Sequence, residues 1–369
     1  MDMIPRRQAG PTRRTLLQAG LAWAASHATC KTGQAATADR CPDRTLVLLH
    51  LSGGNDGLNT LIPYADPLYH EMRPRLARAA RNVLPIDSRV GFHRSLAALV
   101  PVFERGSLAI IQGVGCLSPD YSHVGSCRIW STGMEDGTFR PSGWAGLLDR
   151  LPSGSQGRVV FVGHAARAMM EATLGREVRV VDDGGGGLSS AKNPLEYRPG
   201  QIERTLGRIA QLVSSTRRPA LIFAAVGGFD THADQLEAHK EVLRKLGDGL
   251  ADFQRGLERR GVAQRVLLVA WSEFGRRPAE NASQGTDHGT AGPVFLLGKT
   301  IRGGLFGEAP SLAETDFGDL IPTVDFRTVH AMLADRWLGS GAALADGRGC
   351  VSRKGGADHG DTSKQTAFS

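Results

Sequence analysis

The sequence lacks several features that would place it at once in a class of proteins. Beyond its first thirty residues no apolar run is long enough to cross a membrane. Its 5 cysteines include no C-x-x-C pair, which excludes a zinc ribbon. No stretch of Lys and Arg is interleaved with aromatic residues, which argues against nucleic-acid binding. The remaining composition, 41% hydrophobic and 22% charged, is ordinary for a globular protein with a sizeable core.

The N-terminal 38 residues are typical of an export signal. Arg13 and Arg14 directly precede an apolar run over 16–25, and "AATA" just before Asp39 suits a signal peptidase. We therefore predict a twin-arginine signal peptide, export by the twin-arginine machinery, and a periplasmic or secreted mature chain that starts near Asp39. The alternative is a basic amphipathic helix of the folded protein.

Most of the chain's excess positive charge lies in this N-terminal segment. The whole chain has 44 basic and 37 acidic residues, a net charge of +7. Residues 1–38 hold five of the basic and one of the acidic residues, so 39 − 36 leaves +3. The mature protein therefore has little of the excess positive charge that nucleic acid would attract.

Four cysteines remain after the signal is removed: Cys41, Cys116, Cys127 and Cys350. In an oxidising compartment they could form two disulfides. Cys116 and Cys127 are close in sequence, and a bond between Cys41 and Cys350 would tie the two ends together. Buried thiols outside any disulfide are the alternative.

Strand-like and helix-like patterns alternate along the chain. Apolar runs of strand length occupy 44–51, 107–115, 158–163, 220–228, 265–271 and 293–298, and helical patterns cover 93–105, 201–214, 234–260 and 325–338. This order predicts an α/β fold with a mostly parallel sheet covered on both faces. We expect one domain over 39–350, a cap or insertion around 130–200, and a disordered polar tail at 351–369.

Polar side chains gather where the predicted strands end, and these ends meet at one edge of a parallel sheet. The residues concerned are Asn55, Asp56, Asp230, His232, Ser272, Glu273, Asp287 and His288. Unpaired carboxylates at one edge repel one another, and one or two divalent cations would supply the missing positive charge. Each motif alone is also compatible with a helix cap or a turn. Together they predict a metal site, holding Zn, Mn, Mg or Ca.

Several longer motifs carry a family resemblance. "LHLSGGNDGLNTLIPY", "SHVGSCRIWSTG", "GGFDTH", "SEFGRRPAENASQGTDHG" and "TVDFRTVHAMLADRWLG" resemble the exported bacterial family known as domain of unknown function 1501. The resemblance runs from about residue 13 to 340. The biochemical role of that family is not established, so the resemblance implies no activity by itself.

The family is in turn distantly similar to the alkaline phosphatase and sulfatase superfamily. This resemblance implies a three-layer α/β/α sandwich with two divalent metals at the strand ends. It implies metal ligation by Asp56, Asp230, His232, Glu273 and His288, with Asp287 beside the last of these. The largest departure is Glu273, which stands where the superfamily has an Asp-His pair, so one histidine ligand is missing.

The resemblance leaves the nucleophile open. Ser122 follows the second strand and opens a predicted helix, where backbone N–H groups favour an anionic oxygen; Ser126 is the alternative. His123 would orient either hydroxyl or bind metal, and Arg276 or Arg277 would hold a substrate oxyanion unless both belong to a solvated helix start. The pattern Cys-x-Pro-x-Arg is absent, which excludes the oxidised cysteine of sulfatases.

These observations favour an exported, metal-dependent hydrolase of phosphate esters, with sulfate esters as the second choice. Its expected partner is a small anionic ester or a polysaccharide substrate, with no nucleic acid and no stable membrane span after signal removal. The alternative is a catalytically inactive exported protein on the same fold that binds an envelope polysaccharide or another exported protein.

Overall fold

The structure is a computed structural model. It describes residues 44–134, 143–144, 147, 151, 159–163, 179–181, 201–216 and 218–338. The predicted signal at 1–38, most of the predicted insertion at 130–200, and the predicted tail at 351–369 lie outside these residues.

A nine-stranded sheet forms the centre of the molecule. Its order is β13 (Gly304–Phe306), β5 (Leu108–Gly115), β12 (Ala291–Leu297), β9 (Val266–Trp271), β1 (Thr45–Leu51), β8 (Leu221–Val226), β6 (Val159–Val162) and β7 (Arg179–Val181), and β16 (Val324–Asp325) pairs with β5. β12 is antiparallel to both of its neighbours, whereas the other strands of this sheet pair in parallel. The predicted mostly parallel sheet is therefore confirmed.

The central strand β1 explains why the sheet needs covering on both faces. All of its residues are buried. Val47 and Leu49 belong to one hydrophobic cluster, and Leu46 and Leu48 belong to another on the opposite face, because successive side chains of a strand point to opposite faces. An uninterrupted apolar run can be stable in this position only if helices cover both faces.

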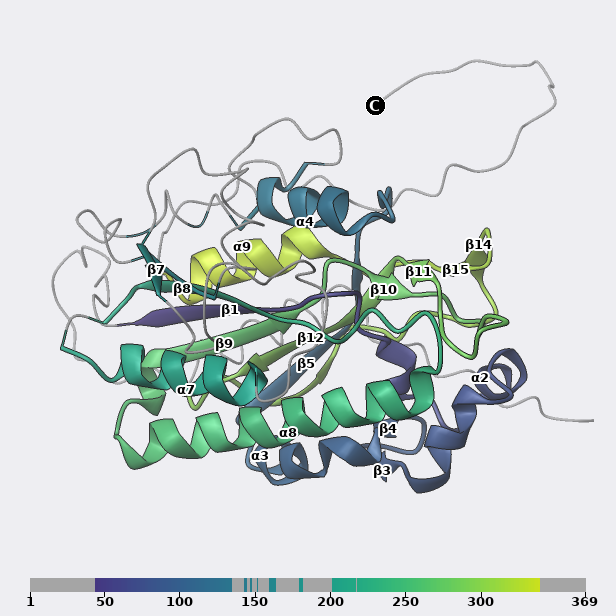
Figure 1. Cartoon of the computed structure of the whole chain (residues 1–369), viewed down its shortest axis with the longest axis horizontal. Helices are drawn as coiled ribbons and strands as arrows, with labels where there is room; N and C mark the ends of the chain where they lie inside the picture. The colour runs from purple at the N-terminus through teal and green to yellow at the C-terminus, as the bar shows by residue number, and fades with distance from the viewer. Residues whose placement is uncertain are drawn as a thin grey trace, which may run out of the picture.

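Helices supply the two outer layers. They are α2 (Pro67–Met72), α3 (Val100–Glu104), α4 (His123–Thr132), α7 (Gln201–Val213), α8 (Gln235–Arg259) and α9 (Phe326–Arg336), with short 3-10 turns η2 (Gly57–Asn59), η3 (Leu76–Asn82), η4 (Arg94–Leu99) and η6 (Ala263–Arg265). Helices α3, α7 and α8 lie on one face of the sheet, and α4 and α9 lie on the other (Figure 1). The predicted three-layer α/β/α architecture is confirmed.

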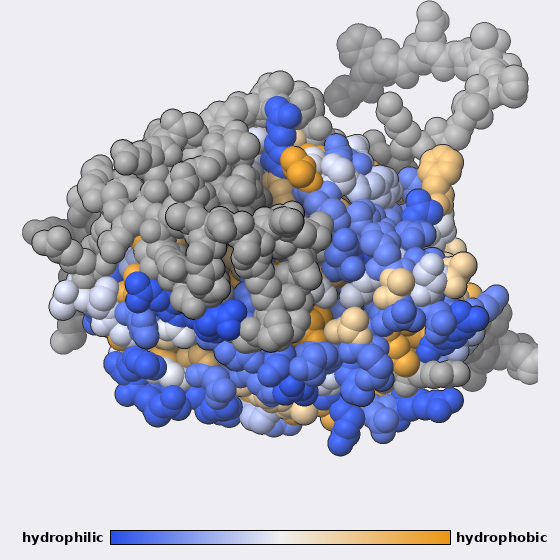
Figure 2. Space-filling view, viewed as in Figure 1, coloured by the Kyte–Doolittle hydropathy of each residue, from blue (hydrophilic) through white to orange (hydrophobic). Residues whose placement is uncertain are grey.

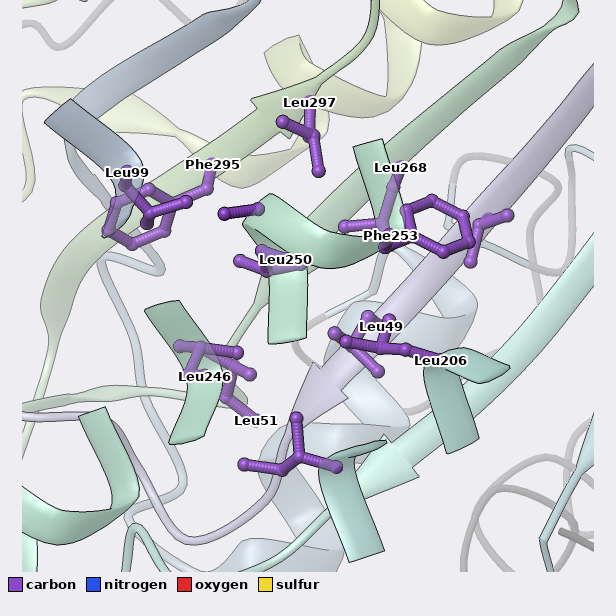
Figure 3. Packing of buried hydrophobic residues seen from close by; sticks show 14 of the residues in the cluster. Leu49, Leu51, Leu99, Leu206, Leu246, Leu250, Phe253, Leu268, Phe295 and Leu297 are labelled. Atoms are coloured by element: carbon purple, nitrogen blue, oxygen red, sulfur yellow. The ribbon is translucent and has the colours of Figure 1, made fainter. Parts of the chain in front are cut away.

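Helix α8 shows how one element fits this frame. Leu246, Leu250 and Phe253 lie on its inner side in a buried cluster with Leu49 and Leu268 of the sheet (Figure 3). Its outer side carries exposed ion pairs such as Arg244 with Glu241, and the face of α7 and α8 is mostly hydrophilic in Figure 2. The helix is amphipathic with the period that a covering layer requires.

The remaining short strands lie outside the main sheet. β2 (Leu61–Ile62), β4 (Gly91–Phe92) and β3 (Leu84–Pro85) form one small sheet, while β10 (Gly275–Arg276) pairs with β11 (His288–Gly289), and β14 (Thr315–Asp316) with β15 (Asp319–Leu320). Within the described ranges, no helix is both long and apolar enough to cross a membrane.

The disulfide considered between Cys116 and Cys127 is absent. Both residues are buried and neither is part of a disulfide. Cys127 lies on α4 and directs its sulfur to Nε2 of His50 at 3.9 Å, so its side chain is used in packing against β1. Cys41 and Cys350 lie outside the described residues.

Candidate metal centre

The loops after β1, β8 and β9 meet at one edge of the sheet, and two glycines allow the contact. Gly53 has φ 118°, and a Cβ atom there would lie 2.3 Å from the backbone nitrogen of Asp230. Gly54 has φ 77°, and its Cβ would lie 2.3 Å from the ring of Phe274. Only glycine fits a left-handed conformation at such close approach. The glycine pair of "SGGND" therefore brings the three loops into contact.

Arg276 fastens these loops together. Its guanidinium donates to the carbonyl oxygens of Gly53, Gly54 at 2.8 Å and Thr286 at 2.6 Å. It also donates to Oδ1 of Asp230 at 2.7 Å. The side chain is buried, and its donors are used within the protein. Arg276 is thus an organising residue of this edge rather than the substrate-binding arginine that the sequence suggested.

Asp230 lies at the centre of a group of imidazoles. Its Oδ1 is 3.1 Å from Nε2 of His232 and 3.5 Å from Nε2 of His288, and those two nitrogens are 2.8 Å apart. Its Oδ2 is 3.5 Å from Nε2 of His123. Burial alone would raise the pKa of Asp230, but hydrogen bonds from His123, His288 and Arg276 outweigh it and hold the pKa far below its usual range. Asp230 is therefore a carboxylate at any physiological pH.

The hydrogen bonds on the far side of two rings determine which nitrogen faces Asp230. Nδ1 of His288 lies 2.6 Å from the carbonyl oxygen of Tyr121. A carbonyl only accepts, so Nδ1 carries the hydrogen and Nε2 of neutral His288 presents a lone pair. Nδ1 of His123 likewise donates to Oε1 of Glu273 at 2.8 Å. Both imidazoles have the partner that metal-ligating histidines commonly have.

The charge states of the rings differ. Burial, with the charge of Arg276 next, lowers the pKa of His232, which is therefore neutral at pH 7. Burial also lowers the pKa of His123, but hydrogen bonds and the charges of Asp230 and Glu273 raise it more, to about 9. Without a bound cation, His123 is an imidazolium, and a metal ion at Nε2 would take the place of that proton.

Glu273 orients the imidazole of His123 and also pairs with that of His50. Its carboxylate accepts from the backbone N–H groups of Gly53 at 2.8 Å and Gly54 at 3.3 Å, and pairs with His50 at 2.8 Å as well as with His123. Burial would raise its pKa, yet the charge of His50 and these hydrogen bonds hold the pKa well below normal. With its oxygens already occupied, Glu273 is suited to holding His123 in place rather than to binding metal directly.

Among the described residues, two groups of side chains have the spacing of metal ligands: His123, Asp230 and His288, and separately His50, Cys127 and Glu273. In the first group, the Asp230 carboxylate and Nε2 of His288 present lone pairs, and Nε2 of His123 would do so once a cation displaces its proton. In the second, the carboxylate is already satisfied, and burial raises the pKa of the Cys127 thiol, which disfavours the thiolate that binds metal. The first group, with His232 beside it, is the better metal centre.

Asp56, also predicted as a ligand, is not brought into this centre. It is fully buried, pairs with Arg73 at 2.6 Å and accepts from Gln235. Burial would raise its pKa, but the charge of Arg73 dominates and lowers it. Asp287 is mostly exposed, lies 3.6 Å from Nδ1 of His232 and accepts from Asn281. It borders the centre on the far side of the His232 ring.

The two candidate serines have different surroundings. Ser122 is the N-cap of α4: its exposed hydroxyl accepts from the Gly125 N–H at 3.0 Å and donates to Asp120. Ser126 is buried and, within the described part of the chain, its Oγ has no hydrogen-bond partner. It lines a small pocket together with Cys116, Trp130, Glu273 and Thr290. Ser122 directly precedes the candidate ligand His123, whereas Ser126 lies one turn deeper.

Sequence reasoning missed His50 and Tyr121. His50 had a signal that could have been used, since it is the one charged or strongly polar residue between Leu46 and Leu51 in an otherwise apolar run. Tyr121 contributes through its main-chain carbonyl, which no sequence pattern reveals.

A segment within the C-terminal half of the chain matches a known family model. Residues 204–336 match the family described as "Protein of unknown function (DUF1501)". The match lies within the predicted range of 13 to 340 and includes three residues of the candidate metal centre: Asp230, His232 and His288. The search of curated proteins found no match to the chain.

The chain also has similarity to solved structures. The zinc complex of the C-terminal periplasmic domain of EcEptC from Escherichia coli is 12% identical, with 79% of this chain and 82% of that chain covered and a TM-score of 0.48. Lipoteichoic acid synthase LtaP from Listeria monocytogenes is 10% identical over 77% and 75%, with a TM-score of 0.39. A protein of the alkaline phosphatase superfamily from Vibrio parahaemolyticus is 11% identical over 86% and 74%, also at 0.39. None of these similarities assigns an activity to this chain.

Proposed function

We propose that this protein is an exported hydrolase of phosphate esters that uses a divalent metal ion, zinc by preference. One observation carries the proposal: Oδ1 of Asp230 and Nε2 of His232 and His288 form a triangle with sides of 2.8, 3.1 and 3.5 Å. Ligand atoms around tetrahedral zinc are about 3.3 Å apart, because each bond is roughly 2.0–2.1 Å long. The triangle therefore has the size that a zinc ion needs.

The ligand types favour zinc over the other metals considered. His123, His232 and His288 are nitrogen donors, and Asp230 is the single carboxylate among them. Magnesium and calcium prefer oxygen ligands, whereas imidazole suits zinc. When bound, the ion would supply positive charge that stabilises the developing negative charge on a phosphoryl group. Glu273 and the Tyr121 carbonyl would hold two of the imidazoles in the required orientation.

A cation that could bind substrate oxygen is also present. Arg277 is partly exposed, unlike the buried Arg276. Its positive charge acts on Asp287 and Tyr121, which both border the centre. A guanidinium in this position can hold two oxygens of a phosphoryl group. We therefore assign to Arg277, and not to Arg276, the role of holding a substrate oxyanion.

Ser122 is the proposed nucleophile. Its Oγ would bond to phosphorus while its proton passes to Asp120 and the bond from phosphorus to the ester oxygen breaks. The departing alkoxide takes a proton from solvent, and Asp120 returns its proton to solvent. Water then cleaves the phosphoserine to release phosphate and restore the serine. The exposed position of Ser122 at the start of α4 supports this role, because helix N-termini favour anionic oxygens.

Metal content tests the centre directly. The full chain, purified without a histidine tag, should contain about one zinc ion per molecule by elemental analysis. Asp230→Ala and His288→Ala should lose the ion and the hydrolysis of bis-p-nitrophenyl phosphate. His70→Ala is the matched control, because His70 is an exposed histidine on α2 that bonds only a backbone carbonyl. Wild-type protein that binds no divalent metal would rule the proposal out.

The nucleophile has its own test. Ser122→Ala should lower kcat by at least about 100-fold, as losing a covalent nucleophile does in other hydrolases, with metal content unchanged. Ser126→Ala should retain most of the activity, because that hydroxyl is buried. The measurement is steady-state kinetics with p-nitrophenyl phosphate, p-nitrophenyl sulfate and a phosphodiester. The reverse ranking of the two variants would move the nucleophile to Ser126.

A non-catalytic exported protein that binds envelope polysaccharide is the second candidate. The saturated carboxylate of Glu273 favours it, since a carboxylate without a vacant lone pair leaves the chain with fewer ligands for a second metal. If this candidate is right, polysaccharide binding should survive both Asp230→Ala and removal of metal by a chelator. If the protein is a hydrolase, both treatments should abolish substrate turnover.

A further inference from the structure

Tyr121 connects the metal centre to the β14–β15 hairpin, which is distant from it in sequence. Its main-chain carbonyl accepts the Nδ1 hydrogen of His288 at 2.6 Å. Its hydroxyl donates to Oδ2 of Asp319 at 3.1 Å. The residue has φ 59°, in the left-handed region that a tyrosine rarely adopts. A conformation of this kind persists only where the surroundings hold it in place.

Asp319 provides a rigid anchor for that hydroxyl. It is 1% exposed, and its Oδ1 accepts from the backbone N–H groups of Leu320 at 2.7 Å and Thr290 at 3.3 Å. A Cβ atom on Gly289 would lie 2.7 Å from the same oxygen. Asp319 of β15 is thus packed against the strand β11 that carries His288, and its second oxygen points to Tyr121.

The consequence for His288 is a fixed tautomer. Because Nδ1 donates to the Tyr121 carbonyl, Nε2 keeps its lone pair and faces Asp230 and His232. If the carbonyl turned away, Nδ1 would lose its acceptor and the hydrogen could move to Nε2. A ring with its hydrogen on Nε2 cannot bind a metal ion through that atom.

We propose that Tyr121 is a positioning residue: its hydroxyl, anchored on Asp319, holds the carbonyl that orients His288 for metal binding. The use of His288 as a ligand rests on the proposed function, whereas the tautomer itself does not depend on metal. The hydrogen bond between Tyr121 and Asp319 therefore raises the affinity of the centre for metal although neither residue is a ligand. Hydrogen-bond partners of ligands act in this way at other metal sites.

Tyr121→Phe tests this role, because it removes the hydroxyl and keeps the ring. In the metal-free full chain, ¹⁵N NMR of the histidine rings should show His288 with its hydrogen on Nδ1 in the wild type and a mixture of tautomers in the variant. Zinc affinity, measured by competition with a chelating dye, should fall about 10- to 100-fold. Asp319→Asn with Tyr121 intact should keep near-wild-type values, since its amide can still pair with the tyrosine hydroxyl.

Tyr64→Phe is the matched control, because Tyr64 also loses a hydroxyl bond to an acceptor, the carbonyl of Asp87 at 2.7 Å. It should change neither the tautomer nor the affinity. An unchanged His288 tautomer and unchanged zinc affinity in Tyr121→Phe would overturn the inference and leave the proposed function intact. Wild-type protein that binds no zinc would overturn the proposed function, and the tautomer measurement alone would then decide the role of Tyr121.

Discussion

At the scale of single residues, burial and partners determine what each carboxylate can do. Asp230 and Asp56 both follow buried strands and both carry a lowered pKa. Asp230 is half-buried, and its oxygens lie beside imidazole nitrogens that can bind a cation together with it. Asp56 is fully buried, and Arg73 already supplies its positive charge. The first is suited to binding metal and the second to holding the loop in place.

This distinction predicts opposite effects of mutation. Arg73→Met should lower the free energy of unfolding by about 3–5 kcal/mol, because it leaves the Asp56 charge buried without its partner. Urea unfolding measures the loss, and zinc content per folded molecule should not change. Arg255→Met, which breaks an exposed pair with Asp252 on α8, should cost no more than about 1 kcal/mol. A folded Arg73→Met protein without zinc would instead return Asp56 to the metal centre.

At the scale of elements, the strands and long helices could be predicted because each is an uninterrupted pattern. The run 44–51 contains β1, and the pattern over 234–260 contains α8. Apolar periodicity reports burial, and burial is what these elements share. It does not report direction: β12 is antiparallel to β5 and β9, and an apolar run has the same appearance in either orientation.

Parts of the site could be predicted for the same reason. The carboxyl ends of parallel strands meet, so Asp230 and Glu273 were expected to be neighbours, and they lie on either side of His123. Asp56 is displaced because the η2 turn, which it caps, directs its side chain toward Arg73. The Tyr121 contact depends on a left-handed backbone and a main-chain oxygen. Neither leaves a trace in the pattern of side chains.

At the scale of the whole molecule, buried histidines predict how stability depends on pH. His239 donates from Nε2 to Asn55 at 3.1 Å and lies near His93. Burial is the largest cause that lowers their pKa values, to about 3 for His239 and about 4 for His93. Both are neutral in the folded protein at pH 5, whereas an unfolded histidine binds a proton below about 6.5.

His123 affects stability in the opposite direction, because its pKa is raised rather than lowered. Its pKa is raised to about 9, so its contribution is complete below pH 6.5 and is lost as the pH rises toward 9. The metal-free protein should therefore be most stable near pH 6.5. As the pH falls from 7 to 5, His239 and His93 bind protons only in the unfolded state. Each should therefore lower the free energy of unfolding by roughly 1–2 kcal/mol. Above about pH 6.5, the folded state loses the His123 proton that pairs with Asp230 and Glu273.

Two comparisons separate these contributions in urea unfolding measured from pH 5 to 9. His239→Gln keeps an N–H donor for Asn55 but cannot titrate, so the slope on the acid side should become shallower even if the variant is less stable overall. Zinc should flatten the alkaline side, because the ion replaces the His123 proton and stays bound as the pH rises. An alkaline slope that zinc leaves unchanged would mean that no metal binds at His123, and the proton would then be the only cation that this ring holds beside Asp230.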